Sequence, residues 1–263
     1  MGSRGHPFAP VPPYETAKRQ QIAGLPLATD QFGEAQPALR LAVLERPPRC
    51  VGRDKEVGEL VAEFLSRKEP IAALVMGGPG IGKTTLIQQA LAHQEIDKKF
   101  EIRRWFVSLE HASDIQSFDA EIVRTLNLEP GTNRFSAAMG LLARDHSLIV
   151  LDNLERAWEA NPVEIEARLR QLAAIPNVVL VASLRGQDAV LGVPWTKQLI
   201  LGPLDIENSI QLFRQIAPKI SSHDPYLRKL ISCLGVFRLR SSSQLYARRR
   251  AIICMMFGKS GGV

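Results

Sequence analysis

From residue 50 onward, short apolar runs alternate with stretches in which apolar residues recur at helical spacing. The apolar runs predict buried strands at 71–76, 102–109, 147–151, 177–183 and 198–201. Helical spacing predicts helices at 54–66, 83–93, 115–126, 135–143 and 163–175, followed by a helix that Asp205 caps. Because strands alternate with helices, we expect an α/β fold with a parallel sheet between two layers of helices.

Four segments differ in composition, and we interpret them as four parts of the chain. Residues 1–48 contain eight prolines, which predicts a Pro-rich linker or disordered arm with one short helix near 38–45. The alternating pattern predicts an α/β domain at 49–202 and the first part of a helical domain at 203–235. Residues 236–263 form a basic tail rich in serine and arginine.

The positive charge of the chain lies in this tail. The whole chain has a formal net charge of +6, and the tail contains six basic residues and no acidic ones, which leaves 27 basic against 27 acidic residues elsewhere. The core therefore shows no charge signature of nucleic-acid binding. In the tail, Arg248–Arg250 with Tyr246 and Phe257 offer charge and aromatic rings for weak binding to RNA, DNA or anionic lipid. The other interpretation is a disordered end without a partner.

No apolar run approaches the roughly 20 residues that a membrane span needs, and the N-terminus lacks the apolar stretch of a secretory signal. Cys50, Cys233 and Cys254 are odd in number and widely spaced, which indicates reduced thiols in a cytoplasmic protein.

A glycine-rich segment between the first predicted strand and the next helix is the first candidate for chemistry. Gly77–Thr84 reads GGPGIGKT and matches the phosphate-binding loop G-x-x-x-x-G-K-[ST] at every fixed position. Small residues allow backbone amides to surround a β-phosphate, and the helix N-terminus points its partial positive charge there. We expect Lys83 to contact the β- and γ-phosphates and Thr84 to ligate Mg²⁺. The predicted contacts are Gly78, Pro79, Gly80, Ile81, Gly82, Lys83, Thr84 and Thr85.

The strand at 147–151 ends in Asp152, about seventy residues after the loop, which is the pattern of a carboxylate that holds Mg²⁺ directly or through water. The next residue is Asn153, where vigorous hydrolases with such a phosphate-binding loop often carry a glutamate base. An amide accepts no proton at neutral pH, so we expect slow hydrolysis. Glu155 has two interpretations, an acid that orients water or a solvated acid at a helix start.

The strand at 177–183 is followed by Arg185 in the pattern Ser-x-Arg. This arginine should lie at the carboxyl edge of the sheet, where it can sense a γ-phosphate. Its position alone favours a surface arginine on a loop, and only the two preceding motifs make the sensing role the better interpretation.

Together with an upstream G-R-x-x-E segment, these motifs resemble the NB-ARC (AP-ATPase) branch of the STAND class of P-loop NTPases. The matching stretches are 50–56, 77–86, 148–153, 183–185 and 201–204, and the resemblance covers about residues 49–235. The run Leu151–Glu155 with Trp158 is similar to bacterial and fungal members. The resemblance implies that Val51 and Gly52 lie near the adenine and Arg53 beside the nucleotide. Without it, Gly52 and Arg53 read as a turn before a helix.

The resemblance also implies a cytoplasmic switch that ADP keeps off and ATP opens, with self-association on activation. ATP rather than GTP follows from the family, since no guanine motif such as N-K-x-D occurs. The effector protein is not identified by the sequence.

The chain departs from the family after Gly235, where the family's G-x-P-L-A motif is expected and no proline occurs. We interpret the chain as truncated, and a frame change, a splice-altered end and a lineage-specific tail all explain it.

Three functions from different classes remain. The first is an ATP/ADP-binding regulatory module with weak ATPase activity. The second is an AAA+ or origin-recognition-type ATPase, which also has an upstream G-R-x-x-E segment, although Asn153 argues against it. The third is a degenerate adaptor that binds no nucleotide.

Overall fold

The computed structural model describes residues 50–66, 70–128, 134–186, 190, 192–216 and 225–233, all of which belong to one unit of the chain. The predicted arm at 1–48, its short helix and the basic tail at 236–263 lie outside these residues.

Five parallel strands form the centre of the described fold, in the order β2-β3-β4-β1-β5. Every residue of β1 and β3 is buried, which explains why these strands read as continuous apolar runs. The predicted parallel α/β fold is therefore confirmed, and it is the fold of a P-loop NTPase. The strands are β1 (Ile71–Gly77), β2 (Arg104–Ser108), β3 (Ser147–Asp152), β4 (Val178–Arg185) and β5 (Lys197–Leu201).

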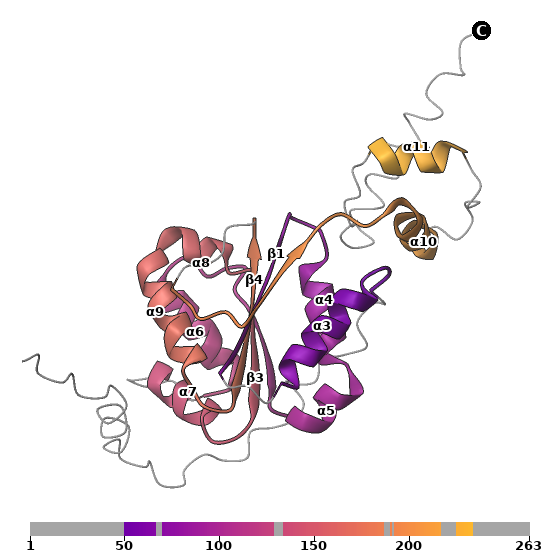
Figure 1. Cartoon of the computed structure of the whole chain (residues 1–263). Helices are drawn as coiled ribbons and strands as arrows, with labels where there is room; N and C mark the ends of the chain where they lie inside the picture. The colour runs from indigo at the N-terminus through magenta and orange to yellow at the C-terminus, as the bar shows by residue number, and fades with distance from the viewer. Residues whose placement is uncertain are drawn as a thin grey trace, which may run out of the picture. The chain divides into compact units, whose positions relative to one another are not determined.

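Helices cover both faces of the sheet (Figure 1). One face carries α3 (Asp54–Phe64), α4 (Lys83–Leu91) and α5 (Gln94–Phe100). The other face carries α6 (Ile115–Thr125), α7 (Arg134–Leu142), α8 (Glu155–Ala160) and α9 (Pro162–Ala173). Two further helices follow the sheet, α10 (Ile206–Ile216) and α11 (Pro225–Cys233).

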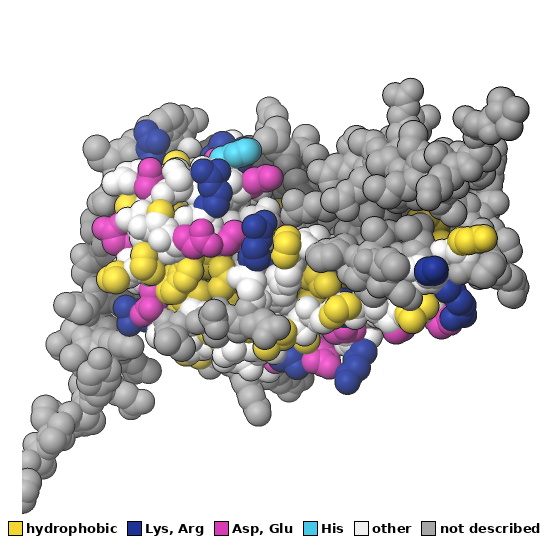
Figure 2. All heavy atoms as spheres, turned by 90° about the horizontal axis from the view of Figure 1, so that it is seen from above, with side chains coloured by type: hydrophobic (Ala, Val, Ile, Leu, Met, Phe, Trp, Pro, Cys, Tyr) yellow, Lys and Arg dark blue, Asp and Glu magenta, His cyan; other side chains and the backbone are white. Residues whose placement is uncertain are grey.

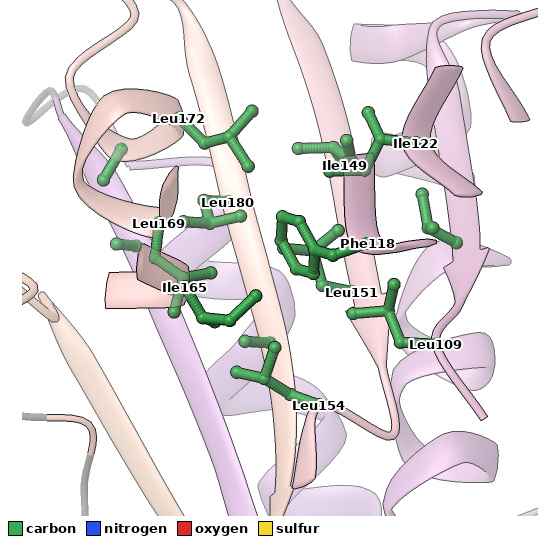
Figure 3. Close-up of a cluster of buried hydrophobic side chains, with 14 of the residues drawn as sticks. Leu109, Phe118, Ile122, Ile149, Leu151, Leu154, Ile165, Leu169, Leu172 and Leu180 are labelled. Atoms are coloured by element: carbon green, nitrogen blue, oxygen red, sulfur yellow. The ribbon is translucent and has the colours of Figure 1, made fainter. Parts of the chain in front are cut away.

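Alternate residues of each strand point into two separate cores. In β1, Leu74 faces the α6–α9 side and Val75 faces the α3–α5 side. Figure 3 shows the first of these cores, in which side chains of α6 and α9 pack on β3 and β4. The labelled side chains are Leu109, Phe118, Ile122, Ile149, Leu151, Leu154, Ile165, Leu169, Leu172 and Leu180.

The path of the chain explains where a ligand belongs. From β1 the chain passes over β4 and β3 to reach β2 at the edge, and it then returns through β3 and β4. The helices that follow β1 lie on the opposite face from those that follow β2 and β3. The strand order therefore reverses beside β1, and open parallel sheets bind ligands at the carboxyl edge at such a point. The glycine-rich loop after β1 lies there.

Several predicted boundaries differ from the structure. The helix expected at 83–93 ends at Leu91, and α5 follows after His93, whose side chain accepts a hydrogen bond from the Glu95 amide. The strand expected from residue 102 begins at Arg104, because a turn precedes it in which the amide of Arg103 donates a hydrogen bond to the carbonyl oxygen of Phe100. The short helix α8 begins at Glu155, where one interpretation of this residue placed a helix start.

The predicted cap at Asp205 is present. Its carboxylate accepts a hydrogen bond of 2.8 Å from the amide of Asn208, in the first turn of α10. Ile210 of α10 packs with Leu227 and Ile231 of α11 in a small third core. None of the helices in the described ranges is long and apolar enough to cross a membrane.

We predict that Phe118→Ala lowers the free energy of unfolding by about 3–5 kcal/mol, because Phe118 is fully buried and its removal leaves a cavity. Urea unfolding of the full chain, followed by circular dichroism, measures the change. The control is Ile102→Ala, which should stay within about 0.5 kcal/mol of the wild type because the side chain is exposed. Equal effects of the two substitutions would contradict the prediction.

Candidate functional site

The glycine-rich loop between β1 and α4 has a backbone that requires its glycines. Gly77, Gly80 and Gly82 have φ angles of +150°, +70° and +101°, a region that favours glycine. A Cβ added at Gly77 would lie 2.9 Å from the carbonyl oxygen of Leu201, so the space is closed as well. The local sequence therefore dictates the loop conformation.

Lys83 begins α4 and lies inside this loop. Its side chain is buried, and Nζ donates hydrogen bonds to the carbonyl oxygens of Gly77 (2.9 Å) and Gly78 (3.2 Å). The amide of Leu86 donates to the Gly82 carbonyl at 2.9 Å and so closes the first turn of the helix. Amides before that turn have no intrahelical acceptor, and they are suited to an anion. The ammonium and the helix N-terminus thus meet at one place.

The carboxylate of Asp152 joins this loop to two neighbouring strands. Oδ2 of Asp152 accepts a hydrogen bond of 2.8 Å from the Thr84 hydroxyl, and Oδ1 accepts one of 2.5 Å from the Ser183 hydroxyl. Oγ of Ser183 also accepts a hydrogen bond of 3.0 Å from the amide of Asn153. The structure therefore brings together Thr84 and Asp152, which the sequence assigned to one metal ion. Ser183 is a contact that the sequence analysis missed.

Burial raises the pKa of Asp152, whose side chain is almost fully enclosed, and the negative charge of Glu155 raises it further. Hydrogen bonds from Ser183 and Thr84 and the charge of Lys83 act in the opposite direction. The ionised carboxylate is consequently costly, and a cation at this position would offset that cost.

A carboxylate and a hydroxyl oxygen are ligands that fit Mg²⁺. Within the described part of the chain, no group of three or more His, Cys, Asp or Glu side chains forms a metal site. Mg²⁺ differs from other metals in that it is commonly bound by one or two protein ligands together with substrate phosphates and water. The donor set of Thr84 and Asp152 fits that mode.

Asn153 redirects the chain from β3 into α8. It has a φ angle of +61°, a left-handed conformation that asparagine tolerates better than most residues. Its amide group lies directly after Asp152 and offers no proton acceptor of carboxylate strength.

Glu155 lies at a helix start, but its side chain is not the solvated one that this interpretation expected. Glu155 is the first residue of α8, as one interpretation expected, but its side chain is only 13% exposed and so is not solvated. Oε1 lies 3.6 Å from Nε of Arg185. Oε2 is buried and has no hydrogen-bond partner among the described residues.

Arg185 ends β4 and is 54% exposed. In the pairing of β1 with β4 it lies opposite Gly77, the first residue of the loop. Arg185 can therefore lie at the surface and also close to the glycine-rich loop, so both interpretations of this residue remain open. Its role as a sensor stays a prediction.

The segment Val51–Arg53 lies against the loop after β5 and the first turn of α10. Arg53 is buried and donates hydrogen bonds to Glu56 Oε1 (2.8 Å) and to the carbonyl oxygen of Gly202. Gly52 has a φ of +68°, and a Cβ there would lie 2.4 Å from Cγ of Asn208. The predicted contact of this segment with adenine stays a prediction.

The surface at the carboxyl edge carries mixed charges. Figure 2 views the protein from that side, and the described side chains include both basic and acidic groups among hydrophobic ones. This pattern agrees with a core that is formally neutral.

Comparison with known proteins gives a match to one family model and a shared fold. Residues 53–175 match the family model of the NB-ARC domain, and no curated protein matches the chain. Among solved structures, Cdc6p from Pyrobaculum aerophilum is similar at 17% identity and a TM-score of 0.50, over 68% of this chain and 52% of that one. ORC1 from Aeropyrum pernix, solved in complex with DNA, is similar at 16% identity and a TM-score of 0.50, over 81% and 69% of the two chains.

A STAND protein with a tetratricopeptide repeat sensor from Pyrococcus horikoshii is similar at 16% identity and a TM-score of 0.47, over 73% of this chain and 29% of that one. In the match with Cdc6p, the chain spans about half the length of that protein. At these identities, the likeness to Cdc6p and ORC1 shows the fold alone.

We predict that Asp152→Asn raises the stability of the nucleotide-free protein at neutral pH. A raised pKa in the folded state contributes stability that is present below the unfolded pKa, near 3.8, and is lost as pH rises through the folded pKa. At neutral pH the charged carboxylate therefore opposes folding, and the neutral amide removes that opposition. Thermal unfolding in EDTA at several pH values should show a gain that shrinks as the pH is lowered.

The matched control is Asp145→Asn, because this carboxylate is 73% exposed and the substitution should leave the midpoint nearly unchanged. A variant Asp152→Asn that is less stable than the wild type at neutral pH would show that the hydrogen bonds to Thr84 and Ser183 outweigh burial.

Proposed function

We propose that this chain, whose residues 53–175 match the NB-ARC family model, is the ATP- and ADP-binding module of a STAND-type signalling protein with weak ATPase activity. The observation that carries the proposal is the 2.8 Å contact between Thr84 in the glycine-rich loop and Asp152 at the end of β3. These two groups come from distant parts of the sequence and meet beside the buried ammonium of Lys83.

The residues of the loop act on the triphosphate by charge and position. Backbone amides of residues 78–85 surround the β-phosphate, and Lys83 donates to the β- and γ-phosphates in competition with the carbonyls of Gly77 and Gly78. Thr84 and Asp152 hold Mg²⁺, which neutralises charge on the phosphate oxygens when it is bound. Arg185, at the neighbouring strand end, contacts the γ-phosphate.

Slow hydrolysis follows from the residue after the buried carboxylate. Asn153 occupies the place where a general base is expected, and an amide does not accept a proton at neutral pH. Bound ATP is therefore hydrolysed slowly, which suits a switch better than a motor.

The switch requires that the γ-phosphate be contacted differently in two states. We assign residues 49–202 to the nucleotide domain and 203–235 to the start of a helical domain. The separate small core of α10 and α11 supports this division. Gly52 lies close to Asn208 of the second part, which brings the two parts together beside the segment before α3. Exchange of ADP for ATP then permits self-association.

The second candidate is an AAA+ or origin-recognition-type ATPase, which the fold likeness to Cdc6p and to DNA-bound ORC1 favours. Asn153 and the neutral core argue for the first candidate.

We predict that isothermal titration of the full chain with ADP and with ATP, each with Mg²⁺, shows binding that Lys83→Ala weakens by about a hundredfold. The reason is that the ammonium compensates phosphate charge in a buried place. Lys98→Ala is the control, since Lys98 is an exposed lysine of α5. If neither the wild type nor Lys83→Ala gave a heat of binding, the result would favour the adaptor that binds no nucleotide.

We predict slow ATP turnover that duplex DNA does not stimulate, and a rise of about tenfold or more in Asn153→Asp, because a carboxylate then follows Asp152. Aspartate also tolerates the left-handed backbone at this position. A phosphate-release assay measures both rates. Fast, DNA-stimulated hydrolysis by the wild type would favour the origin-recognition type.

A further inference from the structure

The ion pair between Glu155 and Arg185 joins the start of α8 to the end of β4. Nε of Arg185 and Oε1 of Glu155 are 3.6 Å apart, which is close enough for attraction and too long for a hydrogen bond. The two side chains differ in exposure, at 54% for Arg185 and 13% for Glu155. The pair thus consists of an enclosed acid and a base that reaches into solvent.

We propose that Glu155 restrains Arg185 and thereby sets the preference of the site for ADP over ATP. This inference rests on the proposed nucleotide binding. Glu155 is a positioning residue, since it acts through Arg185 and does not itself contact the nucleotide.

Arg185 is free to exchange partners because its present contact is a weak one. Phosphate oxygens accept two short parallel hydrogen bonds from a guanidinium, whereas Glu155 offers an ion pair without a hydrogen bond. The strand register places Arg185 opposite Gly77, so the γ-phosphate of a nucleotide in the loop is a nearby competitor for the guanidinium.

The departure of Arg185 leaves Glu155 in an unfavourable state. Oε2 of Glu155 is already buried without a hydrogen-bond partner among the described residues, and Oε1 loses its counter-charge when Arg185 moves. A carboxylate that is largely enclosed and unpaired is destabilising. Asp152 lies close enough that the negative charge of Glu155 raises its pKa.

This penalty falls on the triphosphate alone. ADP lacks the γ-phosphate and leaves the pair intact, whereas ATP must draw Arg185 away from Glu155. The pair therefore lowers the affinity for ATP and leaves the affinity for ADP unchanged, which holds a switch in its ADP form.

The test is a double-mutant cycle on the full chain, with ADP and adenylyl imidodiphosphate as the two probes, each with Mg²⁺, in isothermal titration. We expect Glu155→Gln to raise the affinity for the triphosphate analogue relative to ADP by about tenfold, because the competitor and its penalty are removed. Arg185→Ala should lower the same ratio. In the Arg185→Ala background, Glu155→Gln should leave the ratio unchanged.

Glu159→Gln is the matched control, since it removes the same charge from an exposed position one turn further along α8 and should not change the ratio. Both probes are measured on the same sample, so a partial loss of folding cancels in the ratio. Glu155→Ala provides a second variant that should shift the ratio in the same direction.

The outcomes separate the two proposals. A wild type that binds ADP while Glu155→Gln leaves the ratio unchanged overturns the restraint and keeps the nucleotide site. A shift that persists in the Arg185→Ala background overturns it too, because Glu155 then acts through its own charge. Loss of hydrolysis in Glu155→Gln with an unchanged ratio assigns Glu155 to water positioning and likewise overturns it. If the wild type binds neither probe, both proposals fail.

Discussion

The buried carboxylate of Asp152 is the interaction on which the rest of the site depends. It is almost fully enclosed, and it accepts hydrogen bonds from Thr84 on one side and Ser183 on the other. Thr84 belongs to α4 and Ser183 to β4. The side chain of Asp152 therefore fixes the positions of α4, β3 and β4 relative to one another at the carboxyl edge of the sheet. An ionised carboxylate at such a place is stable only while these donors stay in position. The geometry of the loop and the charge of the site are thus set together.

The burial of Asp152 places the stability of the free protein and the binding of a metal ion in opposition. A raised pKa for Asp152 means that the folded protein without ligand disfavours the charge that metal binding requires. Ligands that bind only the folded state restore this loss by mass action. The size of this stabilisation depends on the affinity and concentration of the ligand, and the charge on Asp152 contributes to the affinity. Occupancy and folding are consequently coupled through a single residue.

The loop between strand and helix follows from local sequence, whereas two contacts of the site that depend on strand order were not predicted. The glycines at 77, 80 and 82 are dictated by their backbone conformations, so the loop could be read directly. The contact between Ser183 and Asp152 requires that β4 lie between β1 and β3, and no periodicity in the sequence gives that order. The enclosure of Glu155 has the same origin, since the helix that it begins packs on a sheet whose order was unknown. Local signals also failed between α4 and α5, where the cap by His93 interrupts an otherwise continuous helical pattern.

Holding and hydrolysing ATP place opposite demands on the groups around a γ-phosphate. Hydrolysis needs an accessible base, whereas Asn153 supplies an amide and Glu155 is largely enclosed and paired with Arg185. The pair leaves one carboxylate oxygen without a partner, which is a poor arrangement for stability and therefore calls for a functional reason. If that reason is competition with the γ-phosphate, the site does not need fast chemistry to reset. The energy of the Glu155–Arg185 pair would then favour the diphosphate state, and hydrolysis would determine only how long the other state lasts.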